Sequence, residues 1–338
     1  MKDHANGWTA GRLLELSGSY WQTCTLHTAV KLDIFSVLGA QSHSAQAIAQ
    51  NLGADTDATA RLLDALTAMG LVIKTEGRYS NTPAGTRFLT RTSPEYIGYM
   101  IMHHHHLVDP WSRLDRAVTT GGPVRGRVSS SDKTWRKNFL MGMFNIASLT
   151  APEVVKKVDL SACHNLLDLG GGPGTYAIHF CLHNPRLRAT IHDRPTTRPV
   201  AEKTVARYQL TDRISFMAGD YTTTPVSGAF DAIWMSHILH GEGADICQTV
   251  LQNAFSAAAP GAMVIVHDFI MTNDMDGPLF PALFSLNMLL GTQGGRAYSE
   301  AQLFDMLAKA GVGDLQRHPF CGPTDSGIIY GRLKPYRT

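Results

Sequence analysis

The spacing of hydrophobic residues predicts helices at the start of the chain. Between residues 11 and 38, apolar side chains recur every three or four positions, as on one face of a helix. Two shorter helices are predicted next, one over 44–52 with Ser42 or Ser44 as its N-cap, and one from Asp57 to Gly70. The apolar residues 71–74 and the stretch 79–81 flank a turn at Gly77, which predicts a β-hairpin. Helices followed by a hairpin, in this order, are typical of a winged helix.

Helical spacing continues up to the middle of the chain. It covers 96–118 and returns over 135–158, where Pro152 is expected to open a new helix after a break. Between these helices, 119–132 is rich in Gly, Ser, Thr and Pro, and reads as a loop.

The pattern changes at Asn165 to short apolar strands that alternate with helices. Such alternation predicts an α/β fold, with a mostly parallel, doubly wound sheet between two layers of helices. We therefore divide the chain into a helical domain (1–118), bridging segments (119–164) and an α/β domain (165–338). The predicted strands are 165–169, 188–192, 214–218, 229–236 and 262–268.

Composition narrows the functional classes. The 338 residues are 44% hydrophobic and 17% charged, so the chain is expected to form large cores. A formal net charge of +2 gives no electrostatic field strong enough to indicate binding to nucleic acid or to a membrane. The first residues lack the apolar stretch of a signal peptide, and no run is long enough to span a membrane. Five scattered cysteines without a C-x-x-C pair favour reduced thiols in a cytoplasmic protein.

A glycine-rich turn is the first candidate binding site. The apolar strand that contains Asp168 leads directly into Gly170-Gly171-Gly172-Pro173-Gly174, and a helical pattern follows. Glycines at such a turn let a ligand approach the backbone closely. The pattern Gly172-x-Gly174-x-x-Ala177 also fits the dinucleotide fingerprint, so a nicotinamide oxidoreductase stays an alternative.

Two further acids follow at the ends of the next strands. Asp193 lies about twenty residues after the glycines, where a carboxylate accepts hydrogen bonds from ribose hydroxyls. Asp220 and Tyr221 close the third strand, and we expect Asp220 to bond an adenine amino group and Tyr221 to stack on the ring. Since ligands of such sheets bind at the carboxyl ends of the strands, a nucleoside site is predicted there.

Several motifs together resemble the small-molecule O-methyltransferase family, which includes plant caffeate and bacterial polyketide O-methyltransferases. The resemblance rests on the glycine turn, on Gly219-Asp220-Tyr221, on His240 in Ser236-His237-Ile238-Leu239-His240-Gly241, on Val264-Ile265-Val266-His267-Asp268, and on Gly294-Gly295-Arg296-Ala297-Tyr298-Ser299-Glu300. It extends to the first half of the chain, which is similar to the winged-helix-like dimerisation domain of that family. Two positions depart from the family pattern: Gly241-Glu242-Gly243 replaces D-W-x-D, and Ala297 replaces a second glutamate.

The resemblance implies a Rossmann-like class I methyltransferase fold, a homodimer and a small-molecule acceptor. S-adenosyl-L-methionine is the implied cofactor and S-adenosyl-L-homocysteine the product. Cofactor contacts are expected from residues at the ends of the strands, namely Asp168, Gly170, Gly171, Gly172, Gly174, Asp193, Asp220, Tyr221 and Ser236.

Methyl transfer to oxygen requires removal of a proton from the acceptor. His240 occupies the position of the family's catalytic histidine, and Asp268 ends a neighbouring strand. A carboxylate bonded to one ring nitrogen fixes the tautomer of a histidine base. Since a phenol has a pKa near 10, it suits such a base better than an aliphatic alcohol does. His237 and His267 are as easily explained by packing as by function.

The acceptor pocket is assigned mainly by resemblance. Met288 matches a position that contacts acceptor rings, and the run His103–His106 falls in a region that forms one pocket wall. His103 and His106 share a helix face, but no neighbouring acid or cysteine completes a metal site, so no metal is expected. Plain helix surface remains an alternative for that run. Phe139 and Met143 are assigned to the same pocket.

Other functions remain open at this level. Methylation of nitrogen or carbon would leave the cofactor half of the sequence unchanged. A winged helix also suits a DNA-binding regulator, but the candidate recognition helix 57–66 has one Arg against two Asp, whereas phosphate contact needs a basic face.

Overall fold

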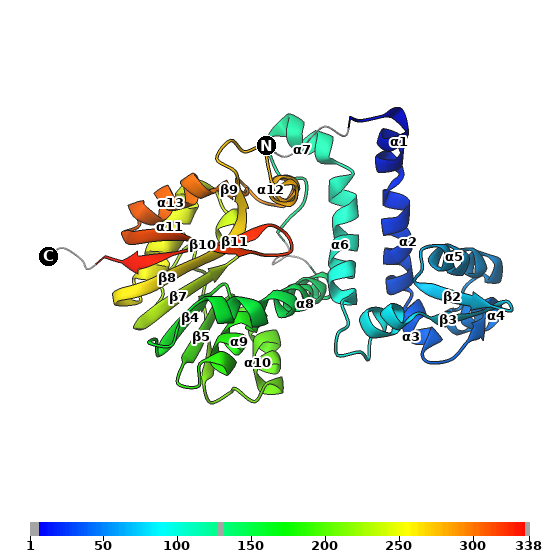
Figure 1. The fold of residues 1–338 in the computed structure, drawn as a ribbon, viewed down its shortest axis with the longest axis horizontal. Coiled ribbons are helices and arrows are strands. Elements are labelled where there is room, and N and C mark those ends of the chain that lie inside the picture. Colours follow the sequence, from blue (N-terminus) through cyan, green and yellow to red (C-terminus); the bar gives the residue numbers. More distant parts are fainter. Residues whose placement is uncertain (1–6, 128–131, 335–338) are drawn as a thin grey trace. The chain divides into compact units, whose positions relative to one another are not determined.

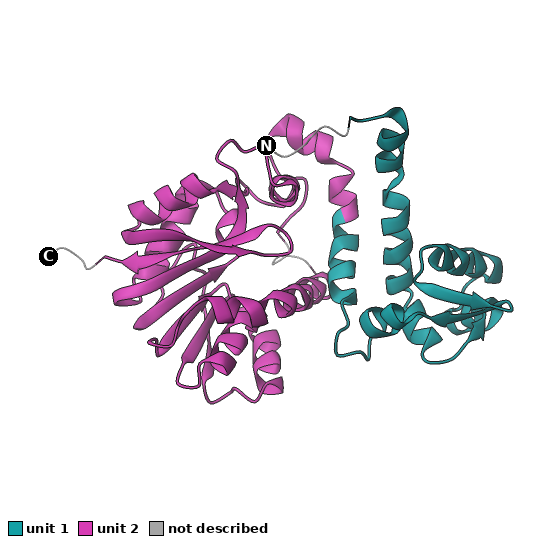
Figure 2. Ribbon diagram, viewed as in Figure 1, with its two compact units in different colours: residues 1–107 teal, residues 108–338 magenta. Residues whose placement is uncertain are grey.

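The computed structural model describes residues 7–127 and 132–334 and divides the chain into two compact units. Unit 1 covers residues 1–107 and unit 2 residues 108–338 (Figure 2). The division falls inside helix α6 (Gly98–Trp111). The three domain ranges expected from the sequence stay a prediction. Part of the predicted 119–132 loop, residues 128–131, lies outside the described residues.

Unit 1 has the order expected of a winged helix. Three helices replace the single pattern over 11–38. Helices α1 and α2 are separated only at Ser19, whose dihedral angles are still helical, and the chain turns at Asp33, whose φ of 59° is left-handed. Ser44 is the N-cap of the next helix and accepts a hydrogen bond from the N–H of Ala47. The elements are α1 (Ala10–Gly18), α2 (Tyr20–Lys31), α3 (Ile34–Leu38), β1 (His43–Ser44), α4 (Ala45–Leu52), α5 (Thr56–Ala68), β2 (Val72–Thr75), β3 (Arg78–Asn81) and the π-helical turn η1 (Gly85–Leu89).

The core of unit 1 forms where these helices meet the small antiparallel sheet, whose strand order is β1-β3-β2. Its centre is made of fully buried side chains from α3 and α5, including Phe35, Leu63 and Leu66. Helix α1 buries none of its residues. On α5, the side chain of Arg61 pairs with Asp57, so the helix that would read DNA has no unpaired arginine.

The helices that follow differ from the sequence expectation at two points. The pattern over 96–118 forms two helices, α6 and α7 (Leu114–Thr120), so residues 119 and 120 are helical and the loop begins at Gly121. Helix α8 (Lys133–Lys157) runs straight through Pro152, and the expected break there is wrong. The residues around the proline, Ala151, Val154 and Val155, are buried against the sheet, and this packing outweighs the hydrogen bond that proline cannot make.

The large sheet of unit 2 contains all five predicted strands in the order β10-β11-β8-β7-β4-β5-β6, with β9 pairing with β8. Strands β4 to β8 are parallel, whereas β11 is antiparallel to both of its neighbours. The hairpin of β10 and β11 was not among the predicted strands. The strands are β4 (Asn165–Leu169), β5 (Arg188–Asp193), β6 (Ile214–Ala218), β7 (Phe230–Ser236), β8 (Ala258–Met271), β9 (Tyr298–Ser299), β10 (Val312–Cys321) and β11 (Ser326–Leu333).

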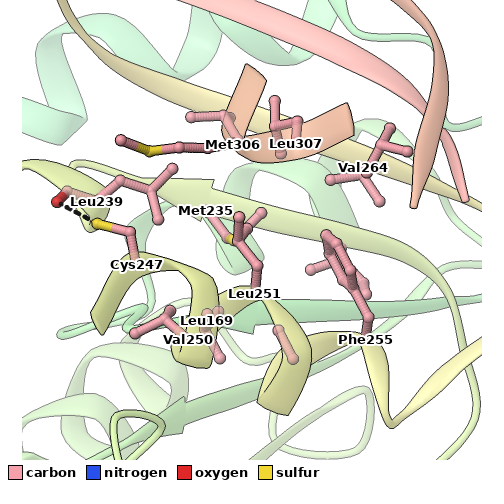
Figure 3. Packing of buried hydrophobic residues seen from close by; sticks show 14 of the residues in the cluster. Leu169, Met235, Leu239, Cys247, Val250, Leu251, Phe255, Val264, Met306 and Leu307 are labelled. Carbon is pink, nitrogen blue, oxygen red and sulfur yellow. Dashed lines mark hydrogen bonds between the residues drawn. The ribbon is translucent and has the colours of Figure 1, made fainter. Parts of the chain in front are cut away.

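Helices cover both faces of this sheet, as the fold class requires (Figure 1). Helices α8, α9 (Thr175–His183) and α10 (Arg198–Arg207) share one core with the sheet. Helices α11 (Ala244–Phe255) and α13 (Glu300–Lys309) share the other core, part of which is drawn in Figure 3. Helix α12 (Leu279–Gly291) and two short 3₁₀ turns, η3 (Pro195–Thr197) and η4 (Leu239–Gly241), complete the unit. None of the helices within the described ranges is long and apolar enough to cross a membrane.

Candidate functional site

The glycine turn between β4 and α9 exposes bare backbone at the carboxyl end of the sheet. Gly170, Gly172 and Gly174 have φ angles of 63°, 53° and 81°, a region that L side chains rarely adopt. A Cβ on Gly171 would lie 2.6 Å from the carboxylate of Asp168. The chain therefore needs glycine here both for its dihedral angles and for the close approach of other groups.

Asp168 lies beneath this turn rather than in the open. It is buried, and the N–H of Ala177, in the first turn of α9, donates to its Oδ2 at 3.2 Å. Burial raises the pKa of Asp168 to about 7, and the bond from Ala177 only partly offsets this. The observed contacts of Asp168 are thus with the backbone that carries the glycine turn.

Asp193, at the end of β5, joins the glycine turn to the next strand. Its Oδ2 accepts from the N–H of Gly172 at 2.8 Å, and its Oδ1 accepts from the N–H of Arg194 at 2.6 Å and the hydroxyl of Thr197 at 3.0 Å. Burial raises the pKa of Asp193 although these three bonds oppose the shift.

Asp220 and Tyr221 follow β6, the neighbour of β5 in the sheet. One oxygen of Asp220 accepts from the backbone and hydroxyl of Thr222, and the other pairs with Arg194 at 3.2 Å. Partial burial would raise the pKa of Asp220, but these bonds and the nearby arginines hold it below its usual value. The three predicted acids therefore end three adjacent strands, β4, β5 and β6.

His240, in the turn η4 after β7, and Asp268 form a buried pair. Asp268 was expected to end its strand, but β8 continues to Met271. The Nδ1 of His240 lies 2.6 Å from Oδ1 of Asp268, and the side chains are 11% and 3% exposed. The N–H of Phe269 also donates to Oδ1, at 2.8 Å. Burial would raise the pKa of Asp268, but His240, His237 and the Phe269 N–H together keep it below its ordinary value. Asp268 is therefore a carboxylate, and Nδ1 of His240 carries the proton between them.

The turn η4, which carries His240, is held by neighbouring elements. Leu239 is buried in the core, and the thiol of Cys247 donates to its carbonyl oxygen at 3.2 Å (Figure 3). On the other side, a Cβ on Gly295 would lie 2.6 Å from the carbonyl oxygen of His240. The second glycine of the Gly294-Gly295 segment is thus required by the backbone of the His240 turn.

Aromatic rings surround the imidazole of His240. Phe269 stacks on it with ring centres 5.8 Å apart and planes inclined by 19°, and Phe284 of α12 meets it edge-on at 4.7 Å. Phe280 packs against both phenylalanines. Met288, the predicted acceptor contact, is buried on the same helix.

Ser236 lies in a network of buried polar groups. Its hydroxyl is 2.9 Å from Nδ1 of His237 and 3.1 Å from Nδ1 of His267, whose Nε2 is 3.0 Å from the hydroxyl of Ser326. Burial lowers the pKa of His237 to about 4 and holds that of His267 well below its ordinary value, so both rings are neutral near pH 7. His237 also has a left-handed φ of 58°.

The remaining predicted residues lie on other elements. His103 and His106 belong to the part of α6 in unit 1, and Phe139 and Met143 lie half-buried on α8 in unit 2. Their assignment to the acceptor pocket stays a prediction. In the described part of the chain, no group of three or more His, Cys, Asp or Glu residues is arranged to hold a metal ion.

The sequence reasoning missed two features of the site. The phenylalanines around His240 were not singled out, because an apolar residue in the sequence does not reveal its partner. Arg127 was not singled out, yet its guanidinium makes two bonds to the carboxylate of Glu242, at 2.6 and 2.7 Å. The departure from the family pattern at Glu242 was its only signal in the sequence.

Family models match residues of both units. The O-methyltransferase domain model matches residues 116–313, and the O-methyltransferase dimerisation domain model matches residues 14–91. The 3-hydroxy-5-methyl-1-naphthoate 3-O-methyltransferase of Streptomyces sahachiroi is 32% identical over 94% of this chain and 94% of its own length. The tetracenomycin polyketide synthesis 8-O-methyl transferase TcmO of Streptomyces glaucescens is 30% identical over 97% of this chain and 98% of its own.

A solved structure supports the same assignment. An O-methyltransferase family protein from Burkholderia thailandensis superposes with a TM-score of 0.87 at 26% identity, covering 98% of this chain and 100% of the other. The match extends over both units, and the family models cover the glycine turn, the three strand-end acids and the His240–Asp268 pair. The chain therefore belongs to the O-methyltransferase family and is an S-adenosylmethionine-dependent O-methyltransferase of small molecules.

Proposed function

We propose that the enzyme methylates a phenolic hydroxyl of an aromatic acceptor, with His240 as the general base and Asp268 as the residue that orients it. The observation that carries this proposal is the buried contact of 2.6 Å between Nδ1 of His240 and the carboxylate of Asp268. A carboxylate bonded to Nδ1 leaves the lone pair of Nε2 free to take a proton. It also stabilises the imidazolium that forms when the proton arrives.

The surroundings of His240 favour an aromatic acceptor. The rings of Phe269 and Phe284 lie against the imidazole, so a flat acceptor would find apolar faces beside the base. Two of the relatives are named for methylation of a hydroxynaphthoate and of a polyketide. The first of these names describes an aromatic acceptor that carries a hydroxyl group.

The strand-end residues fit the cofactor. When bound, S-adenosylmethionine supplies a methyl group already activated by its sulfonium. We assign the bare backbone of the glycine turn to the close approach of the cofactor, Asp193 to the ribose, and Asp220 and Tyr221 to the adenine. Asp168 supports the turn from below, and Ser236 orders the end of β7 through His237 and His267. Alignment of the reactants between these residues and His240 accounts for roughly 7–11 kcal/mol of the barrier when the near-attack geometry is held.

We also propose that the enzyme works as a homodimer formed through unit 1. The dimerisation model matches residues 14–91. Helices α1 and α2 expose several large apolar side chains, among them Leu13, Leu14, Leu16, Tyr20 and Trp21. A second copy of the chain is the partner that would bury this surface.

The base is tested by single-turnover methylation of a phenolic acceptor from pH 6 to 10. We expect His240→Ala to lower the rate roughly 10²- to 10⁴-fold with little change in S-adenosylhomocysteine affinity, because it removes proton transfer alone. Asp268→Asn should lower the rate as well, since an amide N–H facing Nδ1 would move the ring proton to Nε2. Exposed His183 on α9 provides the matched control, His183→Ala, which is expected to behave as wild type.

Superimposable pH profiles of wild type and His240→Ala would exclude a base at this position. That result would leave an enzyme that works by alignment alone, or one whose acceptor offers a free lone pair on nitrogen. A parallel screen of phenols, catechols and amines, read by release of S-adenosylhomocysteine, distinguishes these two cases.

A further inference from the structure

We propose that Arg127 is a positioning residue for the catalytic turn, and that its ion pair with Glu242 sets the place of His240. This inference rests on the proposed role of His240 as the base. It explains why an acid, Glu242, follows the histidine where the family pattern has a different segment.

The contact between Arg127 and the His240 turn is specific in its geometry. Nη1 and Nη2 of Arg127 donate to the two carboxylate oxygens of Glu242, and Nη2 also reaches the carbonyl oxygen of Gly241 at 3.4 Å. The Glu242 side chain is 11% exposed and that of Arg127 38% exposed. A planar guanidinium bound by two parallel bonds fixes orientation as well as distance. A lysine in its place would keep the charge but lose this fork.

The same stretch of backbone is held from its other side. The hydroxyl of Tyr298 donates to the carbonyl oxygen of Glu242 at 2.6 Å, and Cys247 donates to the carbonyl of Leu239. The side chain and N–H of His240 bond to Asp268. Arg127 therefore adds a bond from the 121–127 segment to the bonds that the turn makes with β8, β9 and α11.

The middle of the 121–127 segment is bonded to helix α12, which carries aromatic residues of the site. The N–H groups of Val124 and Arg125 both donate to the carbonyl oxygen of Leu290, at 3.1 and 3.2 Å. Leu290 belongs to α12, which also carries Phe284 and Met288. The segment thus links the helix beside the imidazole to the turn that holds the imidazole, and Arg127 is its bond to that turn.

An ordinary surface ion pair would have little effect on the reaction, because exposed pairs contribute little even to stability. A positioning residue differs in that its removal slows methyl transfer only while the base is present. Small displacements of a reacting group are costly, so we expect Arg127→Ala to lower the single-turnover rate roughly 10- to 10²-fold. Arg127→Lys, which retains the charge, should lose part of the rate and retain the wild-type unfolding temperature.

The experiment compares Arg127→Ala in the wild-type enzyme and in His240→Ala, with a phenolic acceptor and saturating S-adenosylmethionine. We expect Arg127→Ala to lower the single-turnover rate in the wild-type background and to leave it unchanged in the His240→Ala background, because the two residues act as one unit. The exchanged pair Arg127→Glu with Glu242→Arg should recover most of the rate. Arg61→Ala, which removes an exposed ion pair in unit 1, is the control and should behave as wild type.

Each other outcome overturns the proposal. If Arg127→Ala has the wild-type rate while His240→Ala is slow, His240 keeps its role as the base and Arg127 has no positioning role. Equal losses in both backgrounds would assign Arg127 to cofactor binding or to stability, which S-adenosylhomocysteine titration and thermal unfolding then separate. A silent His240→Ala overturns the proposed base, and with it any residue that acts through it.

Discussion

At the scale of single residues, Asp193 makes structural contacts at the position where we propose that it binds the ribose. Three donors from its own chain already contact its oxygens, and one of them is the N–H of Gly172 in the glycine turn. A carboxylate offers about four lone-pair positions, so the ribose would take what remains. Loss of this acid is therefore expected to loosen the turn as well as to remove a ligand contact.

The charge of Asp193 predicts a pH-dependent affinity. Since burial raises its pKa above the ordinary 3.8, the carboxylate form is lost at a higher pH than for an exposed acid. We expect S-adenosylhomocysteine affinity, measured by calorimetry from pH 5 to 8, to fall as pH falls through that raised pKa. Asp193→Asn should bind roughly 10- to 10²-fold more weakly at pH 8, and with a flatter pH dependence.

The stability of the unliganded enzyme should depend on pH in the opposite direction to the ligand affinity. Between the ordinary and the raised pKa, the folded state holds a proton that the unfolded chain has released, so the contribution of Asp193 to stability falls as pH rises. Asp305→Asn, at an exposed ion pair on α13, is the control. Wild-type affinity in Asp193→Asn at pH 8 would refute the ribose assignment.

At the scale of elements, the His240 turn depends on a segment more than fifty residues further along the chain. Gly295 lies against the carbonyl of His240, and a Cβ there would meet Gly241 C at 2.8 Å as well. Both contacts are backbone, which cannot move aside without moving the turn. Gly295 is thus a steric requirement of the turn that carries His240.

Replacement of this glycine tests the dependence directly. We expect Gly295→Ala to lower kcat roughly 10- to 10²-fold, because the added methyl group displaces the backbone that carries the base. Gly122→Ala is the matched control, since a Cβ on Gly122 meets no atom within 4 Å. Steady-state rates and thermal unfolding of both variants give the measurement. Equal rates in the two variants would mean that the turn tolerates displacement.

Two other elements show where local pattern is insufficient. Pro152 was expected to break a helix, but α8 continues because Ala151 and Val154 bury against the sheet. The β10–β11 hairpin was not predicted, because β10 mixes apolar residues with charged ones in no strict alternation. The position of this hairpin in the sheet is set by the antiparallel pairing of β11 with β8, which no local pattern shows.

At the scale of the whole molecule, we expect the chain to form a homodimer. Leu14 and Trp21 are 74% and 68% exposed on helices of unit 1, so this surface is available to a second copy. We expect sedimentation equilibrium to show a dimer at micromolar concentration, and the double variant Leu14→Glu with Trp21→Glu to shift it to monomer. The control Leu182→Glu changes an exposed leucine of α9 and should remain dimeric. A monomeric wild type would contradict the proposal.

Much of this protein was determined by its sequence alone. Hydrophobic periodicity predicted the helical first half, because a period of 3.6 records which face of a helix is buried. A glycine-centred turn predicted the hairpin, and short apolar runs alternating with helices predicted the five strands. The glycine turn and the acids at Asp193 and Asp220 could be placed at one edge, since parallel strands bring their carboxyl ends together. His240 and Asp268 were paired for the same reason.

Tertiary structure alone decided what each of these groups touches. The phenylalanines around His240 come from β8 and α12, and Arg127 reaches Glu242 across more than a hundred residues of chain. No local pattern records such contacts, because the spacing of residues in a segment reports its own buried face and not the identity of the partner. The protonation states follow the same rule: Asp168, Asp193 and Asp268 are all aspartates near strand ends, and burial and neighbours make the first two pKa values rise and the third fall.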